Sequence, residues 1–138
     1  MMKSYQALQS LSDKALFDYV TDSTECVYCD WREAPEDIVT LCNQFITEDL
    51  QLAYAEVDDG FSISNVKNSR FLSFEDDEEL DEGVEGYMDM IRELVSPTYL
   101  IKQFTITEGT DCCSFYLQPK TYWDEFPKVI QDKLFYSE

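Results

Sequence analysis

The chain has 138 residues, a formal net charge of −19 and 44% hydrophobic residues, including nine Phe, nine Tyr and two Trp. These numbers predict a single globular domain over residues 1–138 and argue against a disordered acidic chain, which would be poor in aromatic residues. The negative charge also argues against direct binding to nucleic acid or to an anionic membrane, and it favours a basic protein partner.

Two helices are predicted in the first third of the chain. Apolar residues recur at roughly helical spacing over residues 4–21, where Ser10 or Ser12 can cap a helix part-way through. Residues 23–33 are predicted to be an irregular connection. The second helix is expected to start near Pro35, which suits a first helical turn, because an apolar stripe at helical spacing follows it.

Strands are predicted on both sides of a third helix. Alternating residues over 51–66 predict a hairpin that turns at Asp58-Asp59-Gly60, where Gly60 is available for a positive φ. Residues 70–74, "RFLSF", predict a further short strand. A helical stripe over residues 84–95 then stops before a proline, as helices usually do.

The last third of the chain predicts a second hairpin and a final helix. Residues 99–119 alternate around a turn at residues 108–111, and residues 126–136 predict a helix with Pro127 near its start. The predicted element order is therefore ααβββαββα. We expect an antiparallel α+β fold, with about five strands in two hairpin units and about four helices packed on the sheet.

The densest charge lies in residues 75–85, where eight of eleven residues are acidic. A calcium-binding EF-hand loop is excluded, because aligning Gly83 or Gly86 with the loop glycine places Leu80 or Gly83 at a ligand position. The run is either a solvated loop that leads into a helix or a docking surface for a cationic protein. Without its eight charges the chain would still carry −11, so the acidity is not confined to it. The candidate partner-binding acids are Glu75, Asp76, Asp77, Glu78, Glu79, Asp81, Glu82 and Glu85.

Acidic residues also stand beside aromatic residues in two other segments, "VYCDWRE" (27–33) and "TYWDEF" (121–126). Aromatic anchors within a charged rim are typical of tight protein interfaces. The alternative for Trp31 and Trp123 is ordinary packing in the core. From the second segment, the further candidates for partner binding are Tyr122, Trp123, Asp124 and Glu125.

Five cysteines, two of them adjacent, favour a reducing cytoplasm over a disulfide framework. Cys26 and Cys29 have the spacing of a zinc hairpin, Cys42 follows in the chain, and Cys112 or Cys113 could supply a fourth thiolate. Two observations argue against a zinc site. Cys42 lies on the apolar stripe of the second helix, where a thiol behaves as a small hydrophobic group. Cys112 and Cys113 are adjacent in a predicted strand, so they point to opposite faces of the sheet. A zinc- or thiol-dependent protein that uses Cys26, Cys29 and Cys42 remains an alternative to a protein that acts by binding a partner. For such a binding protein we expect no cofactor.

The sequence offers little for catalysis. It contains no histidine, which removes Ser-His and Cys-His pairs and imidazole ligands, and its four glycines lack the spacing of a phosphate-binding loop. Carboxylate pairs of the glycosidase kind are possible, but 29 acidic residues make such pairs common by chance. The missing catalytic residues lead us to expect a non-enzymatic protein. No signal peptide or membrane-spanning apolar run is recognised, so we also expect the protein to be cytoplasmic.

As a class, the chain resembles the small acidic bacterial immunity proteins that neutralise basic nuclease toxins. The resemblance rests on size, on charge and on the acid–aromatic segments above, and no family motif carries a functional residue over. It implies that carboxylates meet the Lys and Arg residues with which a toxin holds phosphate. A DNA-mimic inhibitor of a nucleic-acid-binding defence protein is the alternative in the same broad class, and an acidic structural or adaptor subunit is a third possibility.

Overall fold

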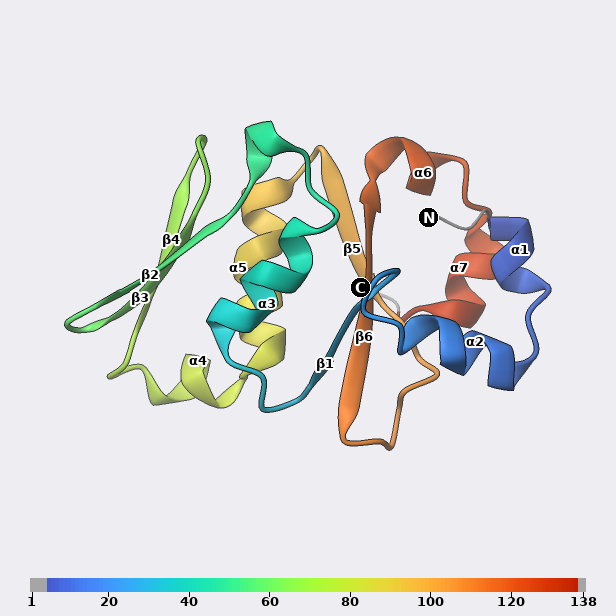
Figure 1. Cartoon of the computed structure of the whole chain (residues 1–138), viewed down its shortest axis with the longest axis horizontal. Coiled ribbons are helices and arrows are strands. Elements are labelled where there is room, and N and C mark those ends of the chain that lie inside the picture. The colour runs from blue at the N-terminus through green and yellow to red at the C-terminus, as the bar shows by residue number, and fades with distance from the viewer. Residues whose placement is uncertain (1–4, 137–138) are drawn as a thin grey trace. The chain divides into compact units, whose positions relative to one another are not determined.

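The computed structural model describes residues 5–136, apart from the side chains of Asp77 and Glu79. Residue 4, where the first predicted helix begins, lies outside this range. The chain divides into two compact units, which we call the terminal unit (Met1–Asp30 with Thr98–Glu138) and the central unit (Trp31–Pro97) (Figure 1). Each unit contains its own three-stranded antiparallel sheet. The organisation of residues 1–138 as one domain stays a prediction.

The α+β class and the antiparallel pairing are confirmed, whereas the predicted number and grouping of elements are not. The described residues form six strands in two sheets, where about five strands in two hairpin units were expected. The helices are shorter and more numerous than the four predicted ones. Within the described part of the chain, no helix is both long enough and apolar enough to cross a membrane.

The terminal unit is built around β6, the central strand of its sheet. The order of strands is β1-β6-β5, and residues 114–118 of β6 are all buried. The Tyr116 ring contacts the rings of Tyr19, Phe104 and Trp123 in one hydrophobic cluster. The elements are α1 (Tyr5–Gln9), α2 (Asp13–Val20), β1 (Val27–Asp30), β5 (Tyr99–Gln103), β6 (Cys112–Pro119), α6 (Lys120–Asp124) and α7 (Lys128–Leu134).

Two predictions for the terminal unit need correction. The expected helix over residues 4–21 is two helices, because the Ser12 hydroxyl accepts a hydrogen bond from the Ala15 N–H and starts α2 afresh. The connection predicted at residues 23–33 contains strand β1, whose four residues pair with β6. That strand is too short to be recognised from alternation, and its partner lies more than 80 residues away in the sequence.

The central unit follows the predicted order closely. The helix at Pro35, the hairpin at 51–66, the strand at 70–74 and the helix at 84–95 are all present. The elements are α3 (Pro35–Asn43), the short 3₁₀ helix η1 (Glu48–Leu50), β2 (Ala53–Val57), β3 (Gly60–Ser64), β4 (Ser69–Ser73), α4 (Asp77–Asp81) and α5 (Val84–Val95).

Gly60 is needed for a close approach, not for a positive φ as predicted. Among the described residues, positive φ values occur at Gly83 (56°) and Gly109 (83°). At Gly60, a Cβ atom would lie 2.1 Å from the carbonyl oxygen of Leu72 on the neighbouring strand β4. Glycine is therefore required there because two backbones meet without room for a side chain.

The sheet of the central unit has one buried face and one exposed face. Phe61, Ile63 and Leu72 point to the buried face, and α5 contacts β3 and β4 (Figure 1). Strand residues alternate between faces, so the opposite face follows from the register. That outer face carries no charged residue, although 28% of the chain is charged. Its residues are Ala53, Ala55, Val57, Gly60, Ser62, Ser64, Ser69, Phe71 and Ser73.

Candidate protein-docking site

The acidic run over residues 75–85 connects β4 to α5 and belongs entirely to the central unit. Part of it forms α4, and Gly83, with a φ of 56°, separates α4 from α5. Glu85 lies in the first turn of α5, where the positive end of the helix favours a carboxylate. The predicted acids whose side chains are described are all exposed, namely Glu75, Asp76, Glu78, Asp81, Glu82 and Glu85.

The side chains of the two remaining predicted acids, Asp77 and Glu79, lie outside the described part of the structure. Their backbone belongs to α4. The described members of the run thus present a solvated acidic surface, a property that both a simple loop and a docking surface would share.

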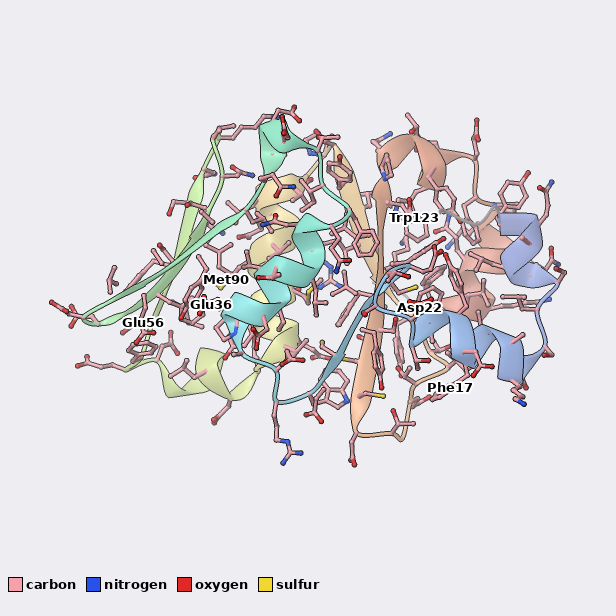
Figure 2. All side chains as sticks on the ribbon, viewed as in Figure 1. Phe17, Asp22, Glu36, Glu56, Met90 and Trp123 are labelled. Carbon is pink, nitrogen blue, oxygen red and sulfur yellow. The ribbon has the colours of Figure 1, made fainter. Side chains whose placement is uncertain are left out.

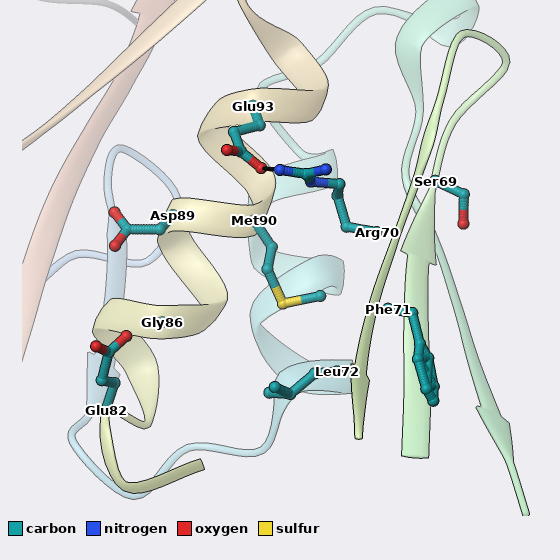
Figure 3. Close-up of a pocket in the computed structure, with 9 residues that line it drawn as sticks. All are labelled: Ser69, Arg70, Phe71, Leu72, Glu82, Gly86, Asp89, Met90 and Glu93. Atoms are coloured by element: carbon teal, nitrogen blue, oxygen red, sulfur yellow. Dashed lines mark ion pairs between the residues drawn. The ribbon is translucent and has the colours of Figure 1, made fainter. Parts of the chain in front are cut away.

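A pocket of about 290 Å³ opens beside this run, between β4 and α5 (Figure 3). One wall belongs to β4, and the other follows one face of α5 together with Glu82, which lies between α4 and α5. Of the acids predicted to bind a partner, Glu82 is the one that lines the pocket. The lining residues are Ser69, Arg70, Phe71, Leu72, Glu82, Gly86, Asp89, Met90 and Glu93.

The helical wall of the pocket has a spacing that is visible in the sequence. Gly86, Met90 and Glu93 follow one another on α5 at intervals of three or four residues, Asp89 stands beside Met90, and Glu82 precedes the helix. Residues at this spacing lie on one face of a helix. Asp89 and Glu93 on this face were not among the predicted partner-binding acids, although the same periodicity could have revealed them.

Three carboxylates and one guanidinium line the pocket, so its lining carries a net charge of −2. Arg70 forms an ion pair with Glu93, and the Asp89 carboxylate accepts a hydrogen bond of 2.7 Å from Arg92. Glu82 has no cationic partner among the described side chains. Exposed pairs such as these contribute little to stability, and their carboxylates stay open to exchange with other cations.

The pocket can hold a cation that carries an apolar stem. Met90 and Leu72 supply apolar wall, and the carboxylates supply negative charge around it. A volume of about 290 Å³ lies at the lower limit of small-molecule pockets, so it suits a single long side chain better than a whole ligand.

The aromatic residues predicted from "TYWDEF" belong to the core of the terminal unit. Trp123 is 4% exposed, and its indole N–H donates a hydrogen bond of 3.0 Å to the Leu100 carbonyl (Figure 2). The Tyr122 ring packs edge-on against Tyr116 at 5.7 Å, and burial raises the pKa of Tyr122 well above its ordinary value. Core packing therefore describes Trp123, and the partly buried Tyr122 packs against the same cluster; a role of either residue in partner binding stays a prediction.

Asp124 and Glu125 are exposed on α6 and after it. Asp124 accepts from the Lys120 ammonium at 3.1 Å, one helical turn earlier. These two acids lie in the terminal unit, whereas the acidic run lies in the central unit. The pocket described above belongs to the central unit, as the acidic run does.

The three cysteines of the zinc hypothesis are all buried and reduced. Cys26 and Cys29 belong to the terminal unit and Cys42 to α3 of the central unit. The sulfur of Cys29 lies 3.7 Å from that of Cys113 across the β1–β6 pairing. Burial raises the pKa of the Cys26 thiol to about 12, although a hydrogen bond with Ser114 opposes this rise. Among the described residues, no group of three or more Cys, Asp or Glu lies close enough to share a metal ion.

Comparisons with protein-family models, with curated proteins and with solved structures found no match.

Proposed function

We propose that this chain is a non-enzymatic binding protein that captures a basic protein, and that it neutralises a nuclease-type toxin, as the immunity proteins it resembles do. The observation that carries the proposal is the acidic surface of the central unit, where the exposed run adjoins an acidic pocket. This surface belongs to a chain of net charge −19.

The charge supports fast capture of a basic partner. Complementary charge raises association rates above the usual 10⁵–10⁶ M⁻¹s⁻¹, to about 10⁸ M⁻¹s⁻¹ or more at low salt. A toxin must be captured before it cuts nucleic acid, so rapid association is the property that such an inhibitor needs. Screening with a Debye length of about 8 Å at physiological ionic strength limits this effect to charges near the docking face.

The exposed carboxylates supply the groups that would compete with phosphate. A nuclease holds phosphate with Lys and Arg, and a carboxylate pairs with the same side chains in charge-assisted hydrogen bonds. Glu82 is suited to this role because no described cation holds its carboxylate and because it lines the pocket. In this mechanism the inhibitor occupies cationic groups of the toxin and performs no reaction itself.

The test is affinity capture from the source cells at low salt, followed by elution with salt and assay of nuclease activity. We expect a basic protein to be retained and its nuclease activity to fall on stoichiometric addition of this chain. Retention of no basic protein would refute the proposal. A retained DNA-binding protein without nuclease activity, displaced by duplex DNA, would favour the DNA mimic instead.

A charge-reversal variant locates the docking face. Glu78→Lys, Asp81→Lys and Glu82→Lys together change the net charge from −19 to −13. We expect the association rate with the captured protein to fall about tenfold or more at low salt and less at high salt.

A matched control changes the net charge equally on the terminal unit. Asp18, Glu108 and Asp111 are exposed there, and their reversal to Lys also gives −13. Both triple variants weaken the long-range electrostatic field to the same degree. They differ in that only the variant of the acidic run would also remove local contacts with the partner. Equal loss of rate in the two variants would show that the acidic run is not the docking face.

A further inference from the structure

We propose that the basic partner adds an extended segment to the free edge of β4 as a fourth strand, with a Lys or Arg side chain in the pocket under α5. This inference rests on the proposed function, because it specifies how the basic partner is held. It combines three independent features of the central unit: an open strand edge, a pocket beside that edge, and negative charge in the pocket.

The edge of β4 is open at its centre. The sheet order is β2-β3-β4, so β4 has a described strand neighbour on one side only. The Phe74 N–H donates to the Asp59 carbonyl at 2.8 Å, and the Asn65 N–H donates to the Asn68 carbonyl at 2.9 Å. Hydrogen-bonded pairs alternate along an antiparallel ladder, so Arg70 and Leu72 bond to β3.

Phe71 therefore directs its backbone N–H and carbonyl away from β3, toward the free edge. The neighbouring outward groups are partly occupied, which limits the free edge to its middle. Asn68 Oδ1 accepts from the Ser69 N–H at 2.9 Å, and the Ser73 carbonyl accepts from the Asp76 N–H at 3.1 Å. A short extended segment centred opposite Phe71 fits this opening.

The pocket lies where the inward side chains of such a strand would point. A fourth strand would run about 4.8 Å from β4, and its residue opposite Phe71 would face the outer side of the sheet. The residues on either side of that position would face the same way as Arg70 and Leu72, which is the side covered by α5. The pocket is lined by β4 and α5 together, so it receives these side chains (Figure 3).

The chemistry of the pocket selects a long basic side chain. Gly86 leaves space on the helical wall, Met90 and Leu72 contact an aliphatic stem, and Glu82 offers a carboxylate that no described cation pairs with. The cation already present, Arg70, is engaged by Glu93. An acidic side chain would meet three carboxylates, and a short one would leave the pocket unfilled.

The edge lacks two of the usual protections against strand addition. Edge strands are commonly blocked by proline, by bulges, by lysines on the edge or by inward-pointing charges. β4 contains no proline and no lysine, its inward charge Arg70 is paired with Glu93, and the outward Phe71 is 50% exposed. Strand addition of this kind obtains affinity from main-chain hydrogen bonds and specificity from pockets for alternate side chains.

The first test uses a synthetic peptide of alternating Thr and Lys, Ac-TKTKTKT-NH₂, with the full chain. We expect bound peptide to slow hydrogen exchange at the Phe71 amide by about tenfold, because that N–H becomes hydrogen-bonded. The matched control peptide carries an N-methyl group on every Thr residue, so its charge is identical but no Thr can donate a backbone hydrogen bond to β4. We expect it to bind about fivefold or more weakly and to leave the Phe71 amide unprotected.

Protein variants test the same contact from the other side. Phe71→Pro removes the outward N–H without breaking a bond to β3, whereas Phe71→Ala removes the exposed ring and keeps the N–H. Gly86→Met places a long side chain on the pocket wall and raises helix propensity, and urea unfolding of the variant separates loss of the pocket from loss of the fold. We expect Phe71→Pro and Gly86→Met to bind the peptide about fivefold more weakly than Phe71→Ala.

Two results overturn the inference, and they are distinguishable. Equal, salt-dependent binding of the two peptides, with no difference among the variants, would refute strand addition and leave capture of basic proteins standing. Failure to bind any cationic peptide or basic protein at low salt would refute the proposed function, and this inference with it.

Discussion

The buried thiol of Cys26 predicts a specific loss of stability at alkaline pH. The ordinary pKa of a cysteine is 9.0, and burial raises that of Cys26 to about 12 in the folded chain. At pH 7 only about one such thiol in 10⁵ is ionised, which disfavours its use as a thiolate nucleophile or ligand. A raised pKa means that the folded state holds the proton more tightly than the unfolded state does. The resulting stabilisation is complete below pH 9 and is lost as the pH rises toward 12.

The size of the expected loss in unfolding free energy follows from the pKa shift of Cys26. One pKa unit corresponds to about 1.4 kcal/mol, so a shift from 9.0 to about 12 corresponds to about 4 kcal/mol over the whole range. Between pH 8 and pH 11 the loss should reach about 2.5 kcal/mol. This is a substantial part of the 5–15 kcal/mol that stabilises a typical domain.

The matched variants are Cys26→Ala and Cys26→Ser, which lack a group that titrates in this range. At pH 8 Cys26→Ala should be less stable than the parent by about 1 kcal/mol, because packing around the buried sulfur is lost. At pH 11 it should be the more stable protein, so the two stability curves cross. Burial also raises the pKa values of Tyr116 and Tyr122 in all three proteins, and the Cys26 thiolate raises them further in the parent alone, which adds to the loss expected for the parent.

The assay is urea unfolding at pH 8, 9, 10 and 11 under reducing conditions, followed by tryptophan fluorescence. Cys26→Ala and Cys26→Ser should differ from each other by a constant amount, since neither side chain titrates. Curves for the parent and Cys26→Ala that stay parallel from pH 8 to pH 11 would refute the reasoning.

Three further predictions concern single positions. Trp123→Phe should lower the free energy of unfolding in urea by about 1–3 kcal/mol, because the Leu100 carbonyl loses its donor. Capture of basic proteins should be unchanged. Unaltered stability with lost capture would instead make Trp123 a contact residue. Gly60→Ala should cost about 1–3 kcal/mol, since its Cβ would lie 2.1 Å from the Leu72 carbonyl oxygen, and a variant as stable as the parent would contradict that crowding. Ellman's reagent should modify one thiol rapidly in the native chain, that of the partly exposed Cys112, and all five in urea; several fast thiols in the native chain would argue against the burial described.

The central unit could be predicted from sequence because its signals are local. The helix from Pro35, the hairpin around Asp58-Asp59 and the helix over 84–95 each depend on periodicity within one short segment. The same local signal explains the correct assignment of the acidic run to a segment that leads into α5.

The terminal unit was harder to predict because its contacts are distant in sequence. Strand β1 is defined by pairing with β6, with Val27 opposite Phe115, and no local pattern announces such a partner. Trp123 and Tyr122 stand beside acids in the sequence, yet they point into the core, because only one face of the short helix α6 is exposed. Adjacent residues on a helix face different directions, so an acid beside an aromatic residue does not imply a shared surface.

One wall of the pocket could be predicted from local sequence, whereas the other depends on residues distant in the chain. Its helical wall follows from the spacing of Gly86, Met90 and Glu93, which the sequence contains. Its other wall, with Arg70 and Leu72, becomes a neighbour only when β4 packs beside α5. The sequence could therefore indicate an acidic helix face but not the strand edge beside it.

The uncharged outer face of the central sheet has a consequence for the behaviour of the protein in solution. Small residues and an exposed Phe71 lie beside the open edge of β4, which is a template for pairing between copies of the same chain. Two copies that approach each other each carry −19, so mutual repulsion takes the place of the lysines and prolines that usually guard such an edge. The chain's acidity thus acts as its protection against aggregation, and we expect self-association to rise with added salt and as the pH falls toward the carboxylate range near 4.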